Sequence, residues 1–216
     1  MGAFKNQLSL HDITMSVNSN PRALISWRLM LLNLTDGLKE QEFVDLIDDA
    51  IDLIVLSFSE TAHHRNGRDE DGITIDIAEI MRAHGFMVEH DTDIGGHCDV
   101  VIRGPKGFLW LAEAKIHSSY NWLNKGYLQL TTRYSTGMVG QQNGSVLIYC
   151  TAPNVKKVID RWKSVYESTY QSDLVTVCPN NPLVFRSELT HERSGLPFTV
   201  RFVPFSLFHQ PKDQTA

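Results

Sequence analysis

The sequence predicts an α/β or α+β layered domain in which a mixed sheet is flanked by helices. Three observations favour this fold class. The chain has 216 residues, which suits one domain with a sizeable core. Helical patterns fill the first third of the chain, and short apolar runs typical of strands alternate with helical patterns in the rest. Only 21% of the residues are charged, which excludes disordered and fibrous classes.

The N-terminal part of the chain predicts two helices. Residues 1–20 lack clear periodicity and end in a turn-like cluster, so we expect an irregular arm there. Residues 22–34 have high helix propensity. A TDG turn separates them from a second helix that runs from about residue 38 to about residue 59. We therefore expect an N-terminal helical arm or oligomerisation segment over residues 1–60, followed by the main domain over residues 61–216.

The second helix carries an acidic stripe and an apolar face. Its acids follow the i, i+3, i+4, i+7 spacing of one helix face: Asp45, Asp48, Asp49 and Asp52. Clustered acids can bind a metal, but a solvated or partner-facing stripe is far more common on helices. The apolar face could serve as a surface for a second copy of the chain or for another protein, and it contains Ile47, Ile51, Ile54 and Val55.

Helices and strands alternate in the rest of the chain. A polar loop over residues 63–72 leads to an amphipathic helix over residues 73–84, which Gly85 can end. Two further helices are expected, over residues 119–136 and 154–169. Seven apolar runs predict strands: 86–90, 98–102, 108–116, 145–150, 174–178, 183–189 and 198–203. Tight connections predict a hairpin between the second and third of these strands, and the last two suggest another.

Three polar residues interrupt the apolar strands: Asp99, Glu113 and Lys115. Residues two apart on a strand share a face, so Glu113 and Lys115 project toward one cleft, and a hairpin brings Asp99 beside Glu113. Two carboxylates can hold Mg²⁺, which polarises a phosphodiester and activates a water. The lysine can orient that water or stabilise the developing negative charge. A structural ion pair is the alternative, although charged groups inside central strands are costly without a role.

The stretch GGHCDVVIRGPKGFLWLAEAKIH resembles the core motif of the PD-(D/E)XK nuclease superfamily. The acid of that motif and its (D/E)-x-K element correspond to Asp99 and to Glu113-Ala114-Lys115. The proline of the motif is absent, because Cys98 precedes the aspartate. The resemblance covers about residues 72–151 and implies a restriction-endonuclease-like fold, with a mixed central sheet flanked by helices and an N-terminal helical extension.

The resemblance also implies roles for individual residues. Mg²⁺, for which Mn²⁺ can substitute, is expected on four residues: Glu79 of the preceding helix, Asp99, Glu113 and Ala114, the last through its carbonyl. The catalytic set is expected to comprise Asp99, Glu113, Lys115 and Gln129. The helix after the motif further offers Arg133 for a phosphate contact and Tyr134, and His117 shares the face parity of Glu113. Ordinary surface or core roles are the alternatives for Glu79, Gln129, Tyr134 and His117.

Charge is distributed in a way that suits a polyanionic substrate. Residues 1–100 carry 7 Lys and Arg against 18 Asp and Glu, whereas residues 101–163 carry 9 against 2. A basic segment attracts nucleic acid through its phosphates, although folding can intermix these charges. We therefore expect a metal-dependent DNA endonuclease, as found in restriction or phage defence. The alternative is a non-catalytic or partner-activated relative that binds nucleic acid through the same fold.

The remaining composition concerns partners and location. No apolar run approaches the length of a membrane span, so we expect no membrane contact. The three cysteines are too scattered for a disulfide framework, and the N-terminus lacks the apolar stretch of a signal peptide. Both features favour a cytoplasmic protein. An unregulated nuclease would harm its host, so we also expect a homo-oligomer or a regulatory protein partner.

Overall fold

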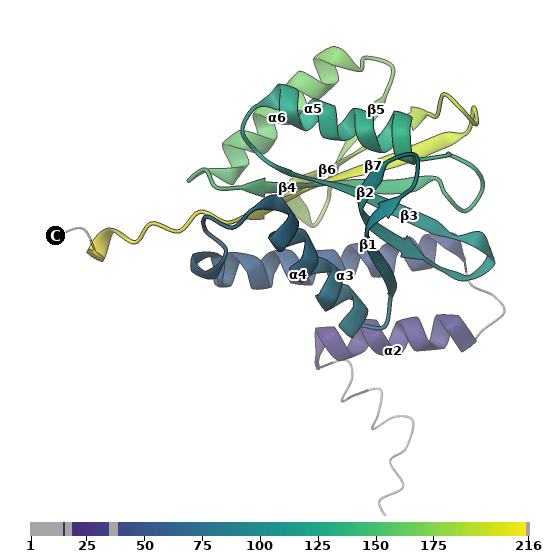
Figure 1. Cartoon of the computed structure of the whole chain (residues 1–216), viewed down its shortest axis with the longest axis horizontal. Helices are drawn as coiled ribbons and strands as arrows, with labels where there is room; N and C mark the ends of the chain where they lie inside the picture. Colours follow the sequence, from purple (N-terminus) through teal and green to yellow (C-terminus); the bar gives the residue numbers. More distant parts are fainter. Residues whose placement is uncertain (1–14, 16–18, 35–38, 215–216) are drawn as a thin grey trace, which may run out of the picture.

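A computed structural model describes residues 15, 19–34 and 39–214 of the chain (Figure 1). These residues form a seven-stranded mixed sheet with helices on both faces, which confirms the expected mixed α/β class. The strands are β1 (Met87–Asp93), β2 (His97–Arg103), β3 (Leu109–Ile116), β4 (Asn143–Cys150), β5 (Leu174–Cys178), β6 (Asn181–Thr190) and β7 (Pro197–Ser206). The late hairpin is confirmed, because β6 and β7 pair in antiparallel register.

The strand order across the sheet is β1-β2-β3-β4-β7-β6-β5. β1, β2 and β3 form an antiparallel meander, whereas β4 pairs in parallel with both β3 and β7. A parallel neighbour requires a crossover connection, since the chain must return to the same end of the sheet. The helix between β3 and β4 supplies that crossover, and it passes over the residues that carry the candidate motif.

Two groups of helices cover the two faces of the sheet (Figure 1). One face packs against α3 (Glu40–Glu60) and α4 (Glu70–Ala83), and α2 (Pro21–Leu34) adds to the same core. The other face packs against α5 (Tyr120–Leu128), a π-helical segment (Gln129–Tyr134) and α6 (Val155–Thr169). No helix in the described part of the chain is long and apolar enough to cross a membrane.

Alternation along β3 decides which face each side chain meets. Trp110 and Ala112 belong to the core beneath α3 and α4, whereas Leu109 and Leu111 belong to the core beneath α5 and α6. Side chains two apart on a strand share a face. Glu113 and Lys115 therefore lie on the face that α5 covers.

The expected docking surface of the second helix is wrong, and the expected solvent-facing stripe is wrong in part, since Asp45 and Asp49 are exposed but Asp48 is not. Ile47 and Ile51 of α3 are fully buried against the sheet within this chain, so this apolar face is not available to a partner. Asp48 is also buried, and it forms ion pairs with Arg186 of β6 and Arg201 of β7. A helix pattern cannot reveal this arrangement, because the two arginines lie 138 and 153 residues away in sequence.

Two helix boundaries differ from expectation. α4 begins at Glu70, inside the expected polar loop, because the side chain of Asp69 accepts a hydrogen bond from the backbone N–H of Gly72 (3.0 Å) and caps the helix. The helix expected over residues 119–136 changes to π geometry at Gln129. The expected TDG turn and most of the expected irregular arm lie outside the described residues.

Candidate active site

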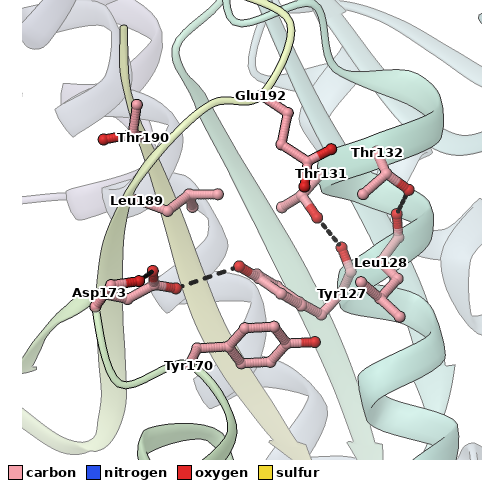
Figure 2. Close-up of a pocket in the computed structure, with 10 residues that line it drawn as sticks. Tyr127, Leu128, Thr131, Thr132, Tyr170, Asp173, Leu189, Thr190 and Glu192 are labelled. Atoms are coloured by element: carbon pink, nitrogen blue, oxygen red, sulfur yellow. Dashed lines mark hydrogen bonds between the residues drawn. The ribbon is translucent and has the colours of Figure 1, made fainter. Parts of the chain in front are cut away.

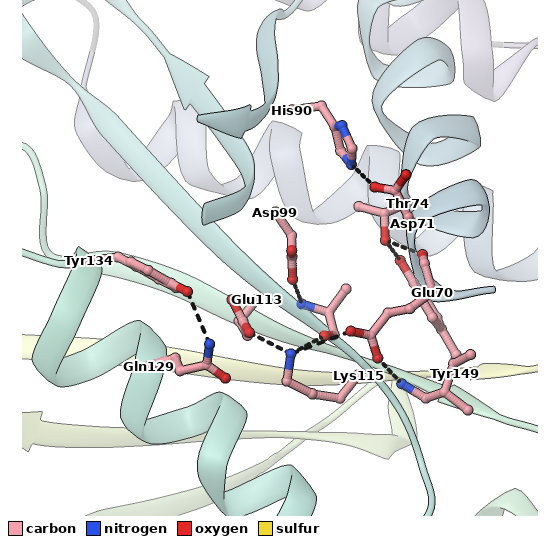
Figure 3. Close-up of polar contacts among 12 residues, drawn as sticks. Glu70, Asp71, Thr74, His90, Asp99, Glu113, Lys115, Gln129, Tyr134 and Tyr149 are labelled. Carbon is pink, nitrogen blue, oxygen red and sulfur yellow. Dashed lines mark hydrogen bonds and ion pairs between the residues drawn. The ribbon is translucent and has the colours of Figure 1, made fainter. Parts of the chain in front are cut away.

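The candidate site lies where β2 separates from β3. Backbone pairing between these strands runs from Arg103 and Leu109 as far as Val100 and Ala112. The next residue on β2, Asp99, uses its side chain instead: its Oδ2 atom accepts a hydrogen bond from the backbone N–H of Ala114 at 2.7 Å. A carboxylate therefore takes the place of a strand partner, and it is held directly beside the Glu113–Lys115 segment (Figure 3).

Lys115 is the centre of this cluster (Figure 3). Its Nζ atom lies 2.5 Å from Oε1 of Glu113, 2.9 Å from the carbonyl oxygen of Ala114 and 3.4 Å from Oε1 of Glu70. The side chains of Lys115 and Glu113 are only 6% and 2% exposed. A buried ammonium needs an acceptor for each of its three protons, and this site supplies three.

Glu70 is the site residue that the sequence reasoning missed. It lies in the first turn of α4, and its Oε2 atom accepts a hydrogen bond from the backbone N–H of Ile116 at 2.6 Å. Carboxylates of Asp99 and Glu70 thus cap two alternate N–H groups of β3, at residues 114 and 116. The Asp69-Glu70-Asp71 sequence is a typical acidic helix start, and it could have revealed that this glutamate opens a helix.

The structure does not bring Glu79 to the cluster. Its side chain is 64% exposed and forms an ion pair with Arg82 at 2.5 Å on the surface of α4. Nine residues separate it from Glu70, which is about 13 Å along a helix. The expectation that Glu79 supplies the helix carboxylate is therefore corrected: Glu70 of the same helix occupies that place.

Burial and like charge together perturb the two strand carboxyls. Burial, followed by the nearby Asp99 carboxylate, raises the pKa of Glu113 to about 8, even though Lys115 acts in the opposite direction. Burial likewise raises the pKa of Asp99. For Lys115, burial lowers the pKa, but the facing Glu113 carboxylate outweighs it, so the pKa is raised and the ammonium stays charged. The pair of carboxyls therefore favours a proton or a further cation between them.

Helix α5 packs tightly over the cluster. A methyl group placed on Gly126 would lie 2.9 Å from Cγ of Lys115 and 3.4 Å from Cγ of Glu113, so only glycine allows this approach. Trp122 of the same helix lies nearby, with its ring centre 5.3 Å from the Lys115 ammonium. The Lys125 ammonium lies 4.7 Å from the same ring. An aromatic ring and a second cation therefore flank the site.

The π-helical segment positions Gln129 and Tyr134. The backbone N–H of Ser135 donates to the carbonyl of Leu130 at 3.0 Å, which is the i to i+5 bond of a π turn. Residues five apart lie about 140° apart around an α-helix, but the wider turn brings them to the same side. The side-chain amide of Gln129 consequently donates to the Tyr134 hydroxyl at 3.1 Å, beside Glu113 (Figure 3).

Two other expected residues have separate positions. Arg133 is exposed at the end of the π-helical segment. His117 follows β3 and is half-buried, with its ring centre 5.2 Å from that of Tyr120. Burial lowers the pKa of His117, so the imidazole is neutral at neutral pH. Its Nε2 atom is buried without a hydrogen-bond partner.

The donor set bears on whether a divalent cation fits here. Within the described residues, no three His, Cys, Asp or Glu side chains form a ready-made ion cluster. Two buried oxygen atoms of the site nevertheless lack a hydrogen-bond partner: Oε2 of Glu113 and Oε1 of Gln129. Both are acceptors, and oxygen ligands are those that Mg²⁺ prefers. Together with the raised pKa of Glu113, this chemistry fits a cation at Asp99 and Glu113.

No family model, curated protein sequence or solved structure matches this chain. The geometry of the cluster is therefore the basis for a functional proposal.

Proposed function

We propose that this protein is a metal-dependent nuclease that hydrolyses phosphodiester bonds in nucleic acid, with DNA as the substrate. One observation carries the proposal. Glu113 is buried with one carboxylate oxygen unpartnered, it lies beside the half-buried carboxylate of Asp99, and its other oxygen contacts the Lys115 ammonium at 2.5 Å. Structural ion pairs do not need a second, repelling carboxylate, whereas metal-assisted hydrolysis does.

The proposal assigns a task to each group. Asp99, Glu113 and the carbonyl of Ala114 would hold Mg²⁺ or Mn²⁺, which supplies a polarised phosphate and a water of lowered pKa when bound. Lys115 would donate a hydrogen bond to the attacking water or to a phosphate oxygen, since its ammonium stays charged. Glu70 would hold that ammonium in place, and Gln129 would contact the substrate beside it.

The arrangement of elements supports a restriction-endonuclease-like fold as part of the proposal. An acid on one strand, a Glu-x-Lys segment on the next antiparallel strand, and helices before and after them are all present. A role in restriction or phage defence, in the cytoplasm and as an oligomer or with a regulatory partner, extends the same proposal. None of the features described above depends on that biological setting.

Cleavage assays test the proposal directly. Supercoiled plasmid and single-stranded DNA are incubated with Mg²⁺ or Mn²⁺, and with EDTA instead, using the wild type, Glu113→Gln and Lys115→Met. We expect metal-dependent nicking that both variants lose while their far-ultraviolet spectra remain unchanged. Glu79→Gln is the matched control, because it removes a glutamate charge from the exposed surface of α4 and should cleave normally. Undiminished cleavage by Glu113→Gln would overturn the proposal.

The contacts of the Lys115 ammonium favour a second possible function. All three protons of the Lys115 ammonium already have acceptors, as in a closed structural ion pair, which suits a non-catalytic relative that binds nucleic acid. The two proposed functions predict different melting temperatures for Glu113→Gln. Removal of a structural partner should lower the melting temperature of Glu113→Gln, whereas removal of a crowded catalytic acid should leave it unchanged or raise it. DNA binding without cleavage by the wild type, combined with a lowered melting temperature of Glu113→Gln, would support the non-catalytic function.

A further inference from the structure

A cavity lies on the side of α5 that faces away from the carboxylate cluster. Figure 2 shows the residues that line it. Gly126 and Gln129 face the cluster, whereas Tyr127 and Thr131 line the cavity. The cavity has a volume of about 270 Å³, which is near the lower end for small-molecule sites. Its wall includes eight polar side chains: Tyr127, Thr131, Thr132, Tyr170, Ser172, Asp173, Thr190 and Glu192.

Five of the six hydroxyl groups of this wall already donate a hydrogen bond, and the exposed Thr190 is the exception. Thr131 and Thr132 donate to backbone carbonyls one turn earlier (2.9 and 2.6 Å), Tyr170 donates to Asn124 (2.7 Å), and Tyr127 donates to Asp173 (3.4 Å). Burial raises the pKa of Tyr127 and of Tyr170, so both phenols keep their protons. What these hydroxyls still offer to a ligand is lone pairs, that is, hydrogen-bond acceptors.

The charge of the cavity has one sign. Asp173 and Glu192 place two carboxylates in the wall, and no Lys, Arg or His side chain lines the cavity in the described part of the chain. The neighbouring Arg193 is directed elsewhere, since its guanidinium donates to the carbonyl of Ser135 at 3.2 Å. The rings of Tyr127 and Tyr170, with centres 4.7 Å apart, add aromatic faces that attract cations.

We propose that this cavity binds a small organic cation through an ammonium or guanidinium group. A cavity that presents hydrogen-bond acceptors, two carboxylates and no cationic side chain is complementary to a ligand that carries several N–H donors and a positive charge. The cation could be a free metabolite or a Lys or Arg side chain of a partner. This inference is independent of the nuclease proposal, because it concerns binding at a different set of residues.

Calorimetric titration of the full chain tests the proposal. The probe is butylammonium chloride, and 1-butanol is the neutral control of the same length. We expect saturable binding of butylammonium and none of 1-butanol. Glu192→Gln removes an exposed carboxylate from the wall and should weaken binding about tenfold or more, which corresponds to the loss of one charge-assisted hydrogen bond. Asp173→Asn should have a similar effect in protein whose melting curve shows that it is folded.

Glu167→Gln is the charge-matched control, since this residue lies on α6 outside the cavity and pairs with Lys163. It should bind butylammonium as the wild type does. A glycine-rich peptide with a single lysine distinguishes the source of the cation: tighter binding of the peptide indicates a partner side chain, and preference for butylammonium indicates a free amine. Absence of saturable binding by either probe, or equal weakening by Glu167→Gln and Glu192→Gln, would overturn the proposal.

Discussion

At the scale of single residues, the cluster is defined by groups that are expensive to bury. Glu113 and Asp99 repel each other in a buried environment, and Lys115 offsets only part of that repulsion. Gly126 allows the helix above to close over them. The site therefore combines electrostatic repulsion between carboxylates with close steric packing. Glu113→Gln tests the repulsion, and Gly126→Ala tests the packing.

The raised pKa of Glu113 predicts how stability depends on pH. The folded protein binds a proton at Glu113 up to about pH 8, whereas an unfolded glutamate releases it near 4.5. The contribution of this residue to the free energy of unfolding should therefore fall as the pH rises from 4.5 to 8. In EDTA, the melting temperature of Glu113→Gln should increase relative to the wild type over that range. A constant difference across the range would contradict the prediction.

A metal ion should reverse part of this effect. We expect Mg²⁺ to raise the melting temperature of the wild type at pH 8, because a ligand that binds only the folded state stabilises it. The same addition should leave Glu113→Gln unchanged. Equal stabilisation of both proteins would place the ion elsewhere.

Gly126→Ala should destabilise the protein although alanine favours helices. Alanine gains about 1 kcal/mol over glycine in a helix interior. The added methyl group, however, would lie 2.9 Å from a buried Lys115 carbon, and overpacking of this kind typically costs about 1–3 kcal/mol. Urea unfolding should show a net loss for Gly126→Ala and none for Asn121→Ala, which adds alanine at an exposed position of the same helix. A more stable Gly126→Ala protein would show that α5 is free to move.

At the scale of elements, one strand edge and one helix start depend on each other. β3 has backbone N–H groups at Ala114 and Ile116 that receive carboxylates instead of a strand partner. The first turn of α4 supplies one of these carboxylates and thereby joins a helix on one face to the cluster on the other. The sheet is thus open at the point where the cluster lies.

Glu70 substitutions should separate its two contacts. Glu70→Ala leaves the Ile116 N–H without its acceptor and should lower the free energy of unfolding by about 1–3 kcal/mol. Glu70→Gln keeps an amide oxygen that can accept from this N–H, so the variant should retain most of the stability. It loses only the negative charge that faces the Lys115 ammonium. Urea titrations measure both effects. Glu79→Ala, on the exposed side of α4, should change stability by no more than about 0.5 kcal/mol.

At the scale of the whole molecule, a partly buried ion network joins helix α3 to strands β6 and β7. Arg201 of β7 donates to both carboxylate oxygens of Asp52 at 2.7 Å and contacts Asp48 at 3.3 Å. Arg186 of β6 pairs with Asp48 at 2.7 Å. Burial raises the pKa of Asp48 despite both arginines. This network fixes α3 on the sheet.

Removing one partner of this network should be costly. Arg201→Met leaves Asp48 and Asp52 with one fewer cation, and loss of a buried partner typically costs about 3–5 kcal/mol. Thermal and urea unfolding measure the loss. The exposed pair of Arg28 and Asp49 gives the contrast, because Arg28→Met should cost no more than about 1 kcal/mol. Similar losses of unfolding free energy in the two variants would show that the network stabilises the fold no more than an exposed ion pair does.

Local patterns predicted the mixed α/β class, most of the element positions and the convergence of Asp99, Glu113 and Lys115. These features depend on helical and strand periodicity, which a sequence displays directly. The position of Glu70 was missed because a capped helix start was read as a loop. The Asp48 network and the π turn at Gln129 depend on packing between distant segments, which no local pattern contains. The assignment of catalysis to the cluster stays a prediction.

The position of β7 has a consequence for how the chain becomes folded. This strand is the last of the seven along the chain, yet it lies between β4 and β6 and pairs with both. During synthesis, β4 and β6 are complete before β7 exists. Until β7 is made, one edge of each strand has unpaired backbone N–H and C=O groups. Non-local pairing of this kind slows folding and populates intermediates that are prone to aggregate. The residues of the carboxylate cluster are therefore synthesised well before the strand that completes the sheet, and a chaperone would protect the unpaired strand edges in that interval.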